Sequence, residues 1–249
     1  MGQVNPGSNT TPHRVLIEEF TGVRCVNCPD GAAEIENLRS KYGENLVTVS
    51  IHAGDFAKKL AASKFDFKIA EGVGLLNFLG SPEGYPSVAI NRKPFGANNT
   101  LNIVGLARWA GIVKDESVLE PESDLKATLT YSTTSRELKV GIEIIPLVNM
   151  TGDHKLTVLL TESNVIDAQI VPALGVKTDY VHKHILRRVL TNTEGQEVTE
   201  VLKKGQVVKK DFSYVLPADF NSKYCEIVAF LHKAGTSKEV VQAVAKKIE

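Results

Sequence analysis

The stretch VLIEEFTGVRCVNCPD, residues 15–30, decides the fold of the first half of the chain. Its first six residues, 15–20, are mainly apolar and predict a buried strand. A Thr-Gly turn signal follows, and then a run of helix-forming residues extends from about residue 29 to residue 42. The sequence therefore places Cys25 and Cys28 where a strand turns into the N-terminus of a helix.

Two cysteines at this position have a direct chemical rationale. The unpaired N–H groups and the positive end of the helix dipole favour a thiolate over a thiol. Two intervening residues let the second sulfur reach the first within one helical turn, so a disulfide forms without displacing the backbone. A half zinc site is the alternative, but structural zinc sites usually need a second Cys or His pair. The C-x-x-C pattern therefore predicts a thiol–disulfide site that needs neither a metal nor an organic cofactor.

Length and composition limit the remaining possibilities. The 249 residues suffice for two domains, and the composition, 43% hydrophobic and 23% charged, is that of a globular chain. Because 29 basic and 29 acidic side chains cancel, no global field recruits nucleic acid or an anionic membrane. No apolar run approaches the roughly 18 residues of a membrane-spanning helix. Three cysteines are too few for a disulfide scaffold.

Strand and helix patterns alternate as far as residue 114, which predicts an α/β layered domain. The expected elements are strands at 15–20, 46–52 and 87–91, and helices at 29–42, 56–79 and 101–114. Helical patterning ends in an acidic, proline-containing stretch at 115–123, where we place a domain boundary.

Beyond the boundary the apolar residues alternate with a period of two, which predicts an antiparallel β-sandwich of immunoglobulin-like size. The expected strands are 125–131, 138–144, 156–160, 181–190, 206–216, 224–232 and 239–248. Cys225 falls on the apolar face of its strand and is expected in the sandwich core. The predicted organisation is a flexible tether at 1–13, an α/β domain at 14–116 and a β-sandwich domain at 123–249.

Three landmarks of the first half resemble the thioredoxin superfamily. They are the strand IEEF ahead of the dithiol (17–20), C-x-x-C opening a helix, and YPSV opening a later strand (85–88). The resemblance implies a thioredoxin-like α/β sandwich and a cis peptide bond between Tyr85 and Pro86, although only ~5–6% of X-Pro bonds in folded proteins are cis. It also implies that Pro86 faces the disulfide and that the Tyr85 backbone meets an extended substrate segment.

Glu19 precedes Cys25 by six residues, where thioredoxins keep a buried acid beneath the second sulfur. By this resemblance, a buried Glu19 with a raised pKa takes the proton from Cys28 when that thiol attacks a mixed disulfide. The alternative is that Glu19 is a solvated strand residue and Glu18 points inward.

Two features depart from the thioredoxin pattern. Arg24 stands where thioredoxins carry tryptophan, and its guanidinium is expected to stabilise a Cys25 thiolate while altering the docking surface. The segment between the dithiol and Pro86 is longer than the compact fold requires, so we expect an extra helical insertion near the site within residues 55–82.

Three histidines invite a metal or redox interpretation. His52 follows the second strand, where it could tune Cys25 or complete a copper or zinc site, but a hydrogen-bonded histidine at a strand end is the favoured interpretation. His182 and His184 share one face if 181–190 is a strand. Their spacing suits a metal, yet no third ligand can be named, and a solvated or domain-facing pair is favoured.

A second resemblance covers the whole chain and concerns the twenty-eight-kilodalton outer membrane protein family of Bacteroidetes. It is carried by EEFTGVRCVNCP (18–29), IHAG (51–54), YPS with a following Asn-Arg (85–92) and YVHKHILR (180–187). The resemblance implies a thioredoxin-like domain followed by a β-domain. It also implies a cell-envelope location, in the periplasm or at the outer membrane, with a lipid anchor as the only membrane association. The polar start is then the tether left after removal of a signal peptide and an anchoring cysteine.

The resulting hypothesis is a cell-envelope thiol–disulfide exchange protein. Cys25, exposed at the helix start, attacks a partner disulfide; Cys28 resolves the mixed disulfide, and Glu19 manages the proton. The partner is a protein or peptide thiol or disulfide, bound by Tyr85, Pro86 and Arg24, and no nucleic acid is involved.

The alternative is a non-enzymatic surface binding protein on the same scaffold, in which the two cysteines form a structural disulfide. A bridge that closes so short a loop contributes only ~1–2 kcal/mol on the loop-length relation. Stability is therefore a weak reason to keep it, and this favours exchange.

Overall fold

A computed structural model of the chain describes residues 11–249. The expected tether, 1–13, falls mainly on residues 1–10, which lie outside the described residues. Residues 12 and 13, shortly before the first strand, contact the body of the protein. His13 is buried and its Nδ1 lies 2.9 Å from the main-chain oxygen of Glu116, while the Gln242 side chain donates to the Pro12 carbonyl (3.0 Å).

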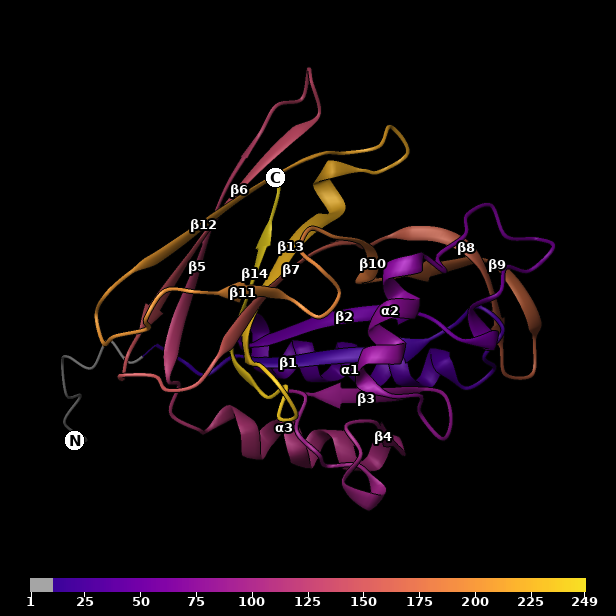
Figure 1. Cartoon of the computed structure of the whole chain (residues 1–249). Coiled ribbons are helices and arrows are strands. Elements are labelled where there is room, and N and C mark those ends of the chain that lie inside the picture. The colour runs from indigo at the N-terminus through magenta and orange to yellow at the C-terminus, as the bar shows by residue number, and fades with distance from the viewer. Residues whose placement is uncertain (1–10) are drawn as a thin grey trace, which may run out of the picture.

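The described part of the chain contains three α-helices and fourteen strands (Figure 1). The first half comprises β1 (Val15–Thr21), α1 (Cys28–Tyr42), β2 (Leu46–His52), α2 (Ala70–Leu79), β3 (Ser87–Ile90), β4 (Ile103–Val104) and α3 (Trp109–Ser117). The second half comprises β5 (Ser123–Tyr131), β6 (Glu137–Pro146), β7 (His154–Glu162), β8 (Val165–Val171), β9 (Gly175–His182), β10 (Ile185–Val189), β11 (Gln196–Val198), β12 (Val208–Val215), β13 (Cys225–Lys233) and β14 (Val240–Lys247).

One large mixed sheet runs through both halves of the protein. Its strand order is β14-β13-β7-β10-β2-β1-β3-β4, with β11 beside β7. β1 and β2 are parallel, β3 is antiparallel to β1, and β10 joins β2 where Ile185 lies opposite Ser50. A three-stranded sheet (β12-β6-β5) and the two-stranded β8–β9 hairpin lie at opposite ends of this sheet in Figure 1. The expected α/β and all-β parts are thus present in a mixed α/β protein, but a single sheet crosses the boundary between them.

β1 is the centre of the first half, because all seven of its residues are buried. On one face, Val15 and Ile17 pack with α1 and α3, where Trp109 is the largest buried side chain. On the other face, Leu16 and Phe20 pack with α2 and β13. A strand covered on both faces is nearly continuous in apolar residues, which is the pattern that predicted it.

The second half is built by packing sheet on sheet. Leu156, Val158 and Leu160 of β7 and alternate residues of β13 form one core with the inner faces of β5 and β6. The neighbouring residues Val228 and Phe230 of β13 point instead into the core of the first half. The core position predicted for Cys225 is confirmed, and burial raises the pKa of its thiol to about 12.

Two predicted helices are shorter than expected. In place of a helix at 56–79, a 3₁₀ turn at Asp55–Ala57 and an irregular segment precede α2. The Asp167 carboxylate accepts hydrogen bonds from the main-chain N–H groups of Lys64 and Phe65 (2.8 Å each), and these bonds attach the irregular segment to β8. The expected extra helical insertion is therefore wrong. In place of a helix at 101–114, α3 begins only at Trp109, after a left-handed Gly105 (φ 88°).

The expected strand 181–190 is divided between two sheets. β9 ends at His182 and β10 begins at Ile185, and His184 between them has a φ of 54°. Since the strand breaks there, the prediction that His182 and His184 share one strand face is wrong.

Candidate functional site

The dithiol is a disulfide at the N-terminus of α1. Cys25 and Cys28 are bonded, with their Cα atoms 5.3 Å apart, and Pro29 occupies the first turn of the helix. The turn that leads into it is fixed by the Cys25 N–H, which donates to the Gly22 carbonyl (3.0 Å). The strand–turn–helix setting predicted for the pair is confirmed.

Cys25 is buried, with only 3% of its surface exposed, so its expected exposure at the helix start is wrong. The segment around Phe56 covers the turn, because the Phe56 carbonyl accepts the N–H of Arg24 (2.9 Å). From β8, the side-chain amide of Gln169 donates to the carbonyl of Cys25 (3.0 Å). Both covering segments lie far from the dithiol in sequence.

Arg24 is exposed, but its guanidinium is already engaged. Nε donates to the carbonyl of Lys58 and Nη2 to that of Lys59, both at 2.7 Å. These contacts fasten the 58–59 loop beside the dithiol. The proposed roles of Arg24 towards the Cys25 thiolate and towards a client stay predictions.

The Tyr85–Pro86 peptide bond is cis, as predicted. Pro86 is buried against α1, since a Cβ built on Gly31 would lie 2.8 Å from its Cβ and Cγ and 3.3 Å from Oε1 of Glu19. Tyr85 is half-buried and its hydroxyl donates to the Ala53 carbonyl (3.1 Å). The cis-proline loop and the buried acid therefore meet at Gly31, one turn beyond Cys28, while the substrate-binding roles of Tyr85 and Pro86 stay predictions.

Gly31→Ala is expected to destabilise the protein by about 1–3 kcal/mol, because a rigid proline ring and the Glu19 carboxyl leave no room for a methyl group. The gain of about 1 kcal/mol in helix propensity does not offset that overlap. Gly111→Ala in α3, where nothing lies within 4 Å, is the matched control and is expected to stabilise by about 0.5–1 kcal/mol. Urea unfolding measures both, and equal effects of the two substitutions would contradict the packing at Gly31.

A cavity of about 410 Å³ lies behind the disulfide, between α1, the central sheet and the β8–β9 hairpin. Cys28 lines it and Cys25 does not. The helix contributes Cys28, Pro29, Ala32, Ala33, Ile35 and Glu36; the sheet contributes Glu19, Thr21, Ser50 and His52. The hairpin and the turn that follows it contribute Gln169, Lys177 and a continuous run from Asp179 to His184.

Glu19 lies at the inner end of this cavity and is 1% exposed. Its Oε2 accepts a hydrogen bond from the Ser50 hydroxyl (2.7 Å), and its Oε1 has no partner. Burial raises the pKa of Glu19 to about 7, and the Ser50 hydrogen bond opposes this only in part. The carboxyl thus changes protonation near neutral pH, in the cavity that Cys28 also lines. Glu18 is buried too, on the opposite face of β1. Glu19 is therefore not the solvated strand residue of the alternative interpretation, although Glu18 does point inward as that interpretation expected.

Two buried histidines form the next part of the wall. The ring centroids of His52 and His182 lie 5.7 Å apart, and both rings pack against Phe67. Burial lowers the pKa of His182 to about 4 and that of His52 well below its ordinary value, so both are neutral at pH 7. His184 lies at the mouth, where Nε2 donates to Glu36 (3.1 Å). This bond, with that of Lys183, lowers the pKa of Glu36 to about 2.

No group of three or more His, Cys, Asp or Glu side chains within residues 11–249 is arranged to hold a metal ion. His52 and the two sulfurs therefore do not form the copper or zinc site considered from the sequence, and the two sulfurs are bonded to each other. Four residues that line the cavity each have a buried side-chain atom without a hydrogen-bond partner: Glu19 Oε1, His52 Nδ1, His182 Nε2 and His184 Nδ1. Buried polar atoms are normally paired, so these atoms indicate a site for a ligand or for water.

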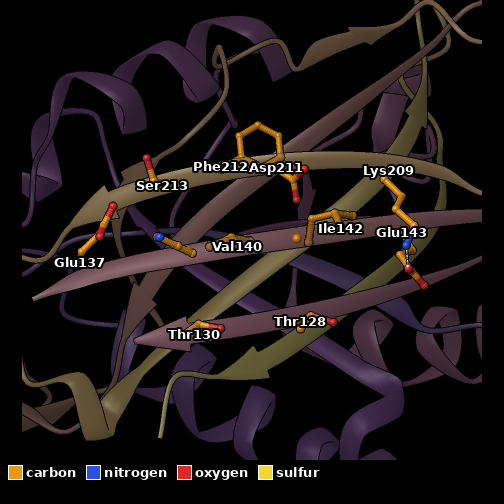
Figure 2. Close-up of a pocket in the computed structure, with 12 residues that line it drawn as sticks. Thr128, Thr130, Glu137, Val140, Ile142, Glu143, Lys209, Asp211, Phe212 and Ser213 are labelled. Atoms are coloured by element: carbon orange, nitrogen blue, oxygen red, sulfur yellow. Dashed lines mark ion pairs between the residues drawn. The ribbon is translucent and has the colours of Figure 1, made fainter. Parts of the chain in front are cut away.

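A second concavity, of about 650 Å³, lies on the outer face of the three-stranded sheet (Figure 2). Figure 2 shows exposed hydroxyls and charges along β5, β6 and β12, with Lys209 paired to Glu143 (2.8 Å). Its charged side chains are satisfied or solvated, and none of the unpartnered buried atoms of the described chain belongs to it. The cavity behind Cys28, whose lining residues carry unpartnered buried polar atoms, is therefore the candidate functional site.

Comparison with known proteins agrees with this architecture. Residues 81–249 match the model of the family described as outer membrane protein Omp28. The fold is similar to HBP35 of Porphyromonas gingivalis, at 19% identity and a TM-score of 0.75, over 97% of this chain and 77% of that one. It is also similar to a protein of Agrobacterium tumefaciens, at 16% identity and a TM-score of 0.58, over 94% of both chains.

A domain of the outer membrane lipoprotein Omp28 from P. gingivalis matches 53% of the chain, with 92% of its own length covered, 20% identity and a TM-score of 0.36. No curated protein matches the chain significantly. None of the helices in residues 11–249 combines the length and the apolar character that a membrane span requires. The family match covers more than half of the sequence, and the chain therefore belongs to the Omp28 outer membrane protein family.

Proposed function

We propose that this protein is a cell-envelope thiol–disulfide oxidoreductase that works through the Cys25–Cys28 pair, with Glu19 carrying the proton. One observation carries the proposal: a disulfide at a helix N-terminus shares a cavity with a buried carboxyl group whose pKa is about 7. Efficient general acid–base catalysis needs a group that titrates near the working pH. The client carries a thiol or a disulfide.

The architecture and the family name support the setting of this activity. In the proposal, the first half is a thioredoxin-like unit that holds the disulfide, and the second half is an immunoglobulin-like sandwich that positions it or binds a partner. Because the family is named for the outer membrane, we place the protein at that membrane or in the periplasm, held by a lipid anchor.

The alternative is a binding protein whose disulfide is structural. The burial of Cys25 and the segments fastened over it favour this alternative, because an exchanging sulfur must be reachable.

Equilibration in dithiothreitol redox buffers distinguishes the two functions. We expect the Cys25–Cys28 bridge to equilibrate with a midpoint potential between about −120 and −270 mV, the range of known exchange proteins. Alkylation followed by mass spectrometry measures the reduced fraction. Cys225 should remain unmodified in the folded protein because it is buried, and it is the internal control. A bridge that stays oxidised below about −300 mV would identify a structural disulfide.

A further inference from the structure

We propose that the cavity behind the disulfide binds a low-molecular-weight thiol or its disulfide, of amino-acid to short-peptide size, and that exchange enters the pair through Cys28. The inference rests on the proposed exchange function and names its substrate class. It reverses the order expected from the sequence, in which Cys25 reacts first with a protein or peptide.

The two cysteines of the disulfide differ in how a small molecule can reach them. At Cys25, the Phe56 segment and the Gln169 amide close the turn, and Arg24 fastens the adjoining loop. At Cys28, the residue itself forms part of the cavity wall. A molecule that approaches through the cavity therefore meets Cys28 and not Cys25.

The dimensions of the site favour a small molecule. A volume of about 410 Å³ lies within the ~300–1,000 Å³ of small-molecule sites. Cys28 is only 2% exposed, so a disulfide on the surface of a folded protein cannot reach it while α1 and β9 keep their positions. A slender thiol can enter between them.

The polar groups of the cavity suit an amino-acid-derived ligand. Half of the eight unpartnered buried side-chain atoms in the described residues belong to residues that line this one cavity, namely Glu19, His52, His182 and His184. Neutral imidazoles and a protonated carboxyl can pair with the amine, amide and carboxylate groups of such a ligand. Two ion pairs also line the cavity, Lys177 with Asp179 and Lys183 with Glu36, so a zwitterion that enters can exchange partners with them.

The exchange balances without a further reactant. A thiolate RS⁻ attacks the sulfur of Cys28, the R–S–Cys28 bond forms, the bond between the two cysteines breaks, and Cys25 leaves as a thiolate that takes up a proton. A second thiolate RS⁻ attacks the R sulfur, releasing RSSR; the leaving Cys28 thiolate receives the proton of Glu19, and Glu19 is reprotonated by the proton that the second RSH released. In sum, two RSH and the protein disulfide give RSSR and the protein dithiol, and the reverse sequence reduces RSSR.

Single-cysteine variants test the order of the two sulfurs. In Cys25→Ser, we expect cystine or glutathione disulfide to form a mixed disulfide at Cys28, with a rate that saturates as the concentration of the small disulfide rises. In Cys28→Ser, we expect adduct formation at Cys25 to be at least tenfold slower. Mass spectrometry of the intact protein follows both, and buried Cys225 is present in each variant.

A cavity-filling variant tests the binding site. In the Cys25→Ser background, Ala32→Leu projects into the cavity and is expected to raise the half-saturating concentration about tenfold. Asn37→Leu adds a similar side chain to an exposed position of the same helix and is expected to leave it unchanged. S-methylglutathione, which cannot exchange, should slow adduct formation competitively in protein with an unaltered cavity, a readout that does not depend on the folding of any cavity variant.

Several results would overturn the inference while leaving the exchange function standing. They are faster adduct formation at Cys25 than at Cys28, a rate that never saturates, an unchanged half-saturation in Ala32→Leu, or preferential reaction with a peptide disulfide. The last result would assign the cavity to a polypeptide client. A wild-type bridge that cannot be reduced in the dithiothreitol buffers would instead remove the exchange function itself.

Discussion

Glu18→Gln is expected to destabilise the fold by about 3–5 kcal/mol, because it leaves the charge of Arg92 buried without a counter-ion. Both side chains are fully buried, and the guanidinium binds the carboxylate at two points, each 2.7 Å long. Arg92 also lies over the ring of Phe230, with 4.6 Å between the guanidinium carbon and the ring centroid. The pair joins β1 to the loop after β3, under the strand β13 of the second half.

The double variant Glu18→Gln/Arg92→Met distinguishes the loss of the ion pair from the cost of leaving one charge buried without a partner. Since it leaves no buried charge, its cost is expected to be smaller than the sum of the two single costs. Urea unfolding at pH 7 with the disulfide intact measures all three proteins. Glu143→Gln, which breaks an exposed ion pair with Lys209, is the control and should leave the midpoint unchanged. Additive costs would show that the pair contributes through packing alone.

The parts of the site that lie within one continuous segment could be predicted from the local sequence. The strand, turn and helix around Cys25 and Cys28 were predictable, because residues 15–42 carry their own apolar period and turn residues. The cis bond before Pro86 followed from a resemblance, and the core position of Cys225 from the period of its strand. Each of these depends on interactions within a few residues or on a motif.

The parts that the sequence did not predict depend on contacts between distant segments. The carbonyl of Cys25 is hydrogen-bonded by Gln169, 144 residues away, and the irregular segment before α2 is attached to Asp167, about 100 residues away. The sheet joins its two halves where Ile185 meets Ser50. Nothing in the period of either strand indicates that pairing, so the sequence predicted two separate modules where one sheet exists.

The wall of the cavity shows the same limit. A run of residues in β9 and the following turn encloses the side of α1 that carries Cys28, although the sequence indicated only a strand with two histidines. The residues expected to bind a client, Tyr85, Pro86 and Arg24, lie outside this cavity. The polar atoms that mark the site are recognisable only from their lack of partners in three dimensions.

Replacing Glu19 by glutamine is expected to remove a pH dependence of stability of roughly 3 kcal/mol. The folded pKa of about 7 is above the ordinary value of 4.5, so the folded state binds the proton more tightly. The stabilisation is complete below about pH 4 and is lost as the pH rises through 7. The pKa values of His52 and His182 are lowered, so these two residues make the protein less stable on acidification. Both histidines are present in wild type and in the variant, so their contribution cancels in the comparison. Urea unfolding of wild type and Glu19→Gln from pH 4 to 8 isolates the Glu19 contribution as their difference.

The same substitution should remove the proton carrier of exchange. At pH 7 we expect the rate of disulfide exchange to fall about 100-fold in Glu19→Gln, and the inflection near pH 7 in the wild-type rate to disappear. Glu34→Gln on α1 also replaces a carboxylate by an amide, outside the cavity, and is the control. If the inflection survives in Glu19→Gln, another group carries the proton. Because the pKa of His182 is about 4 and that of His52 is lowered as well, neither imidazole could produce an inflection at pH 7. A surviving step would therefore point to a thiol of the pair itself, with Glu19 reduced to a structural acid.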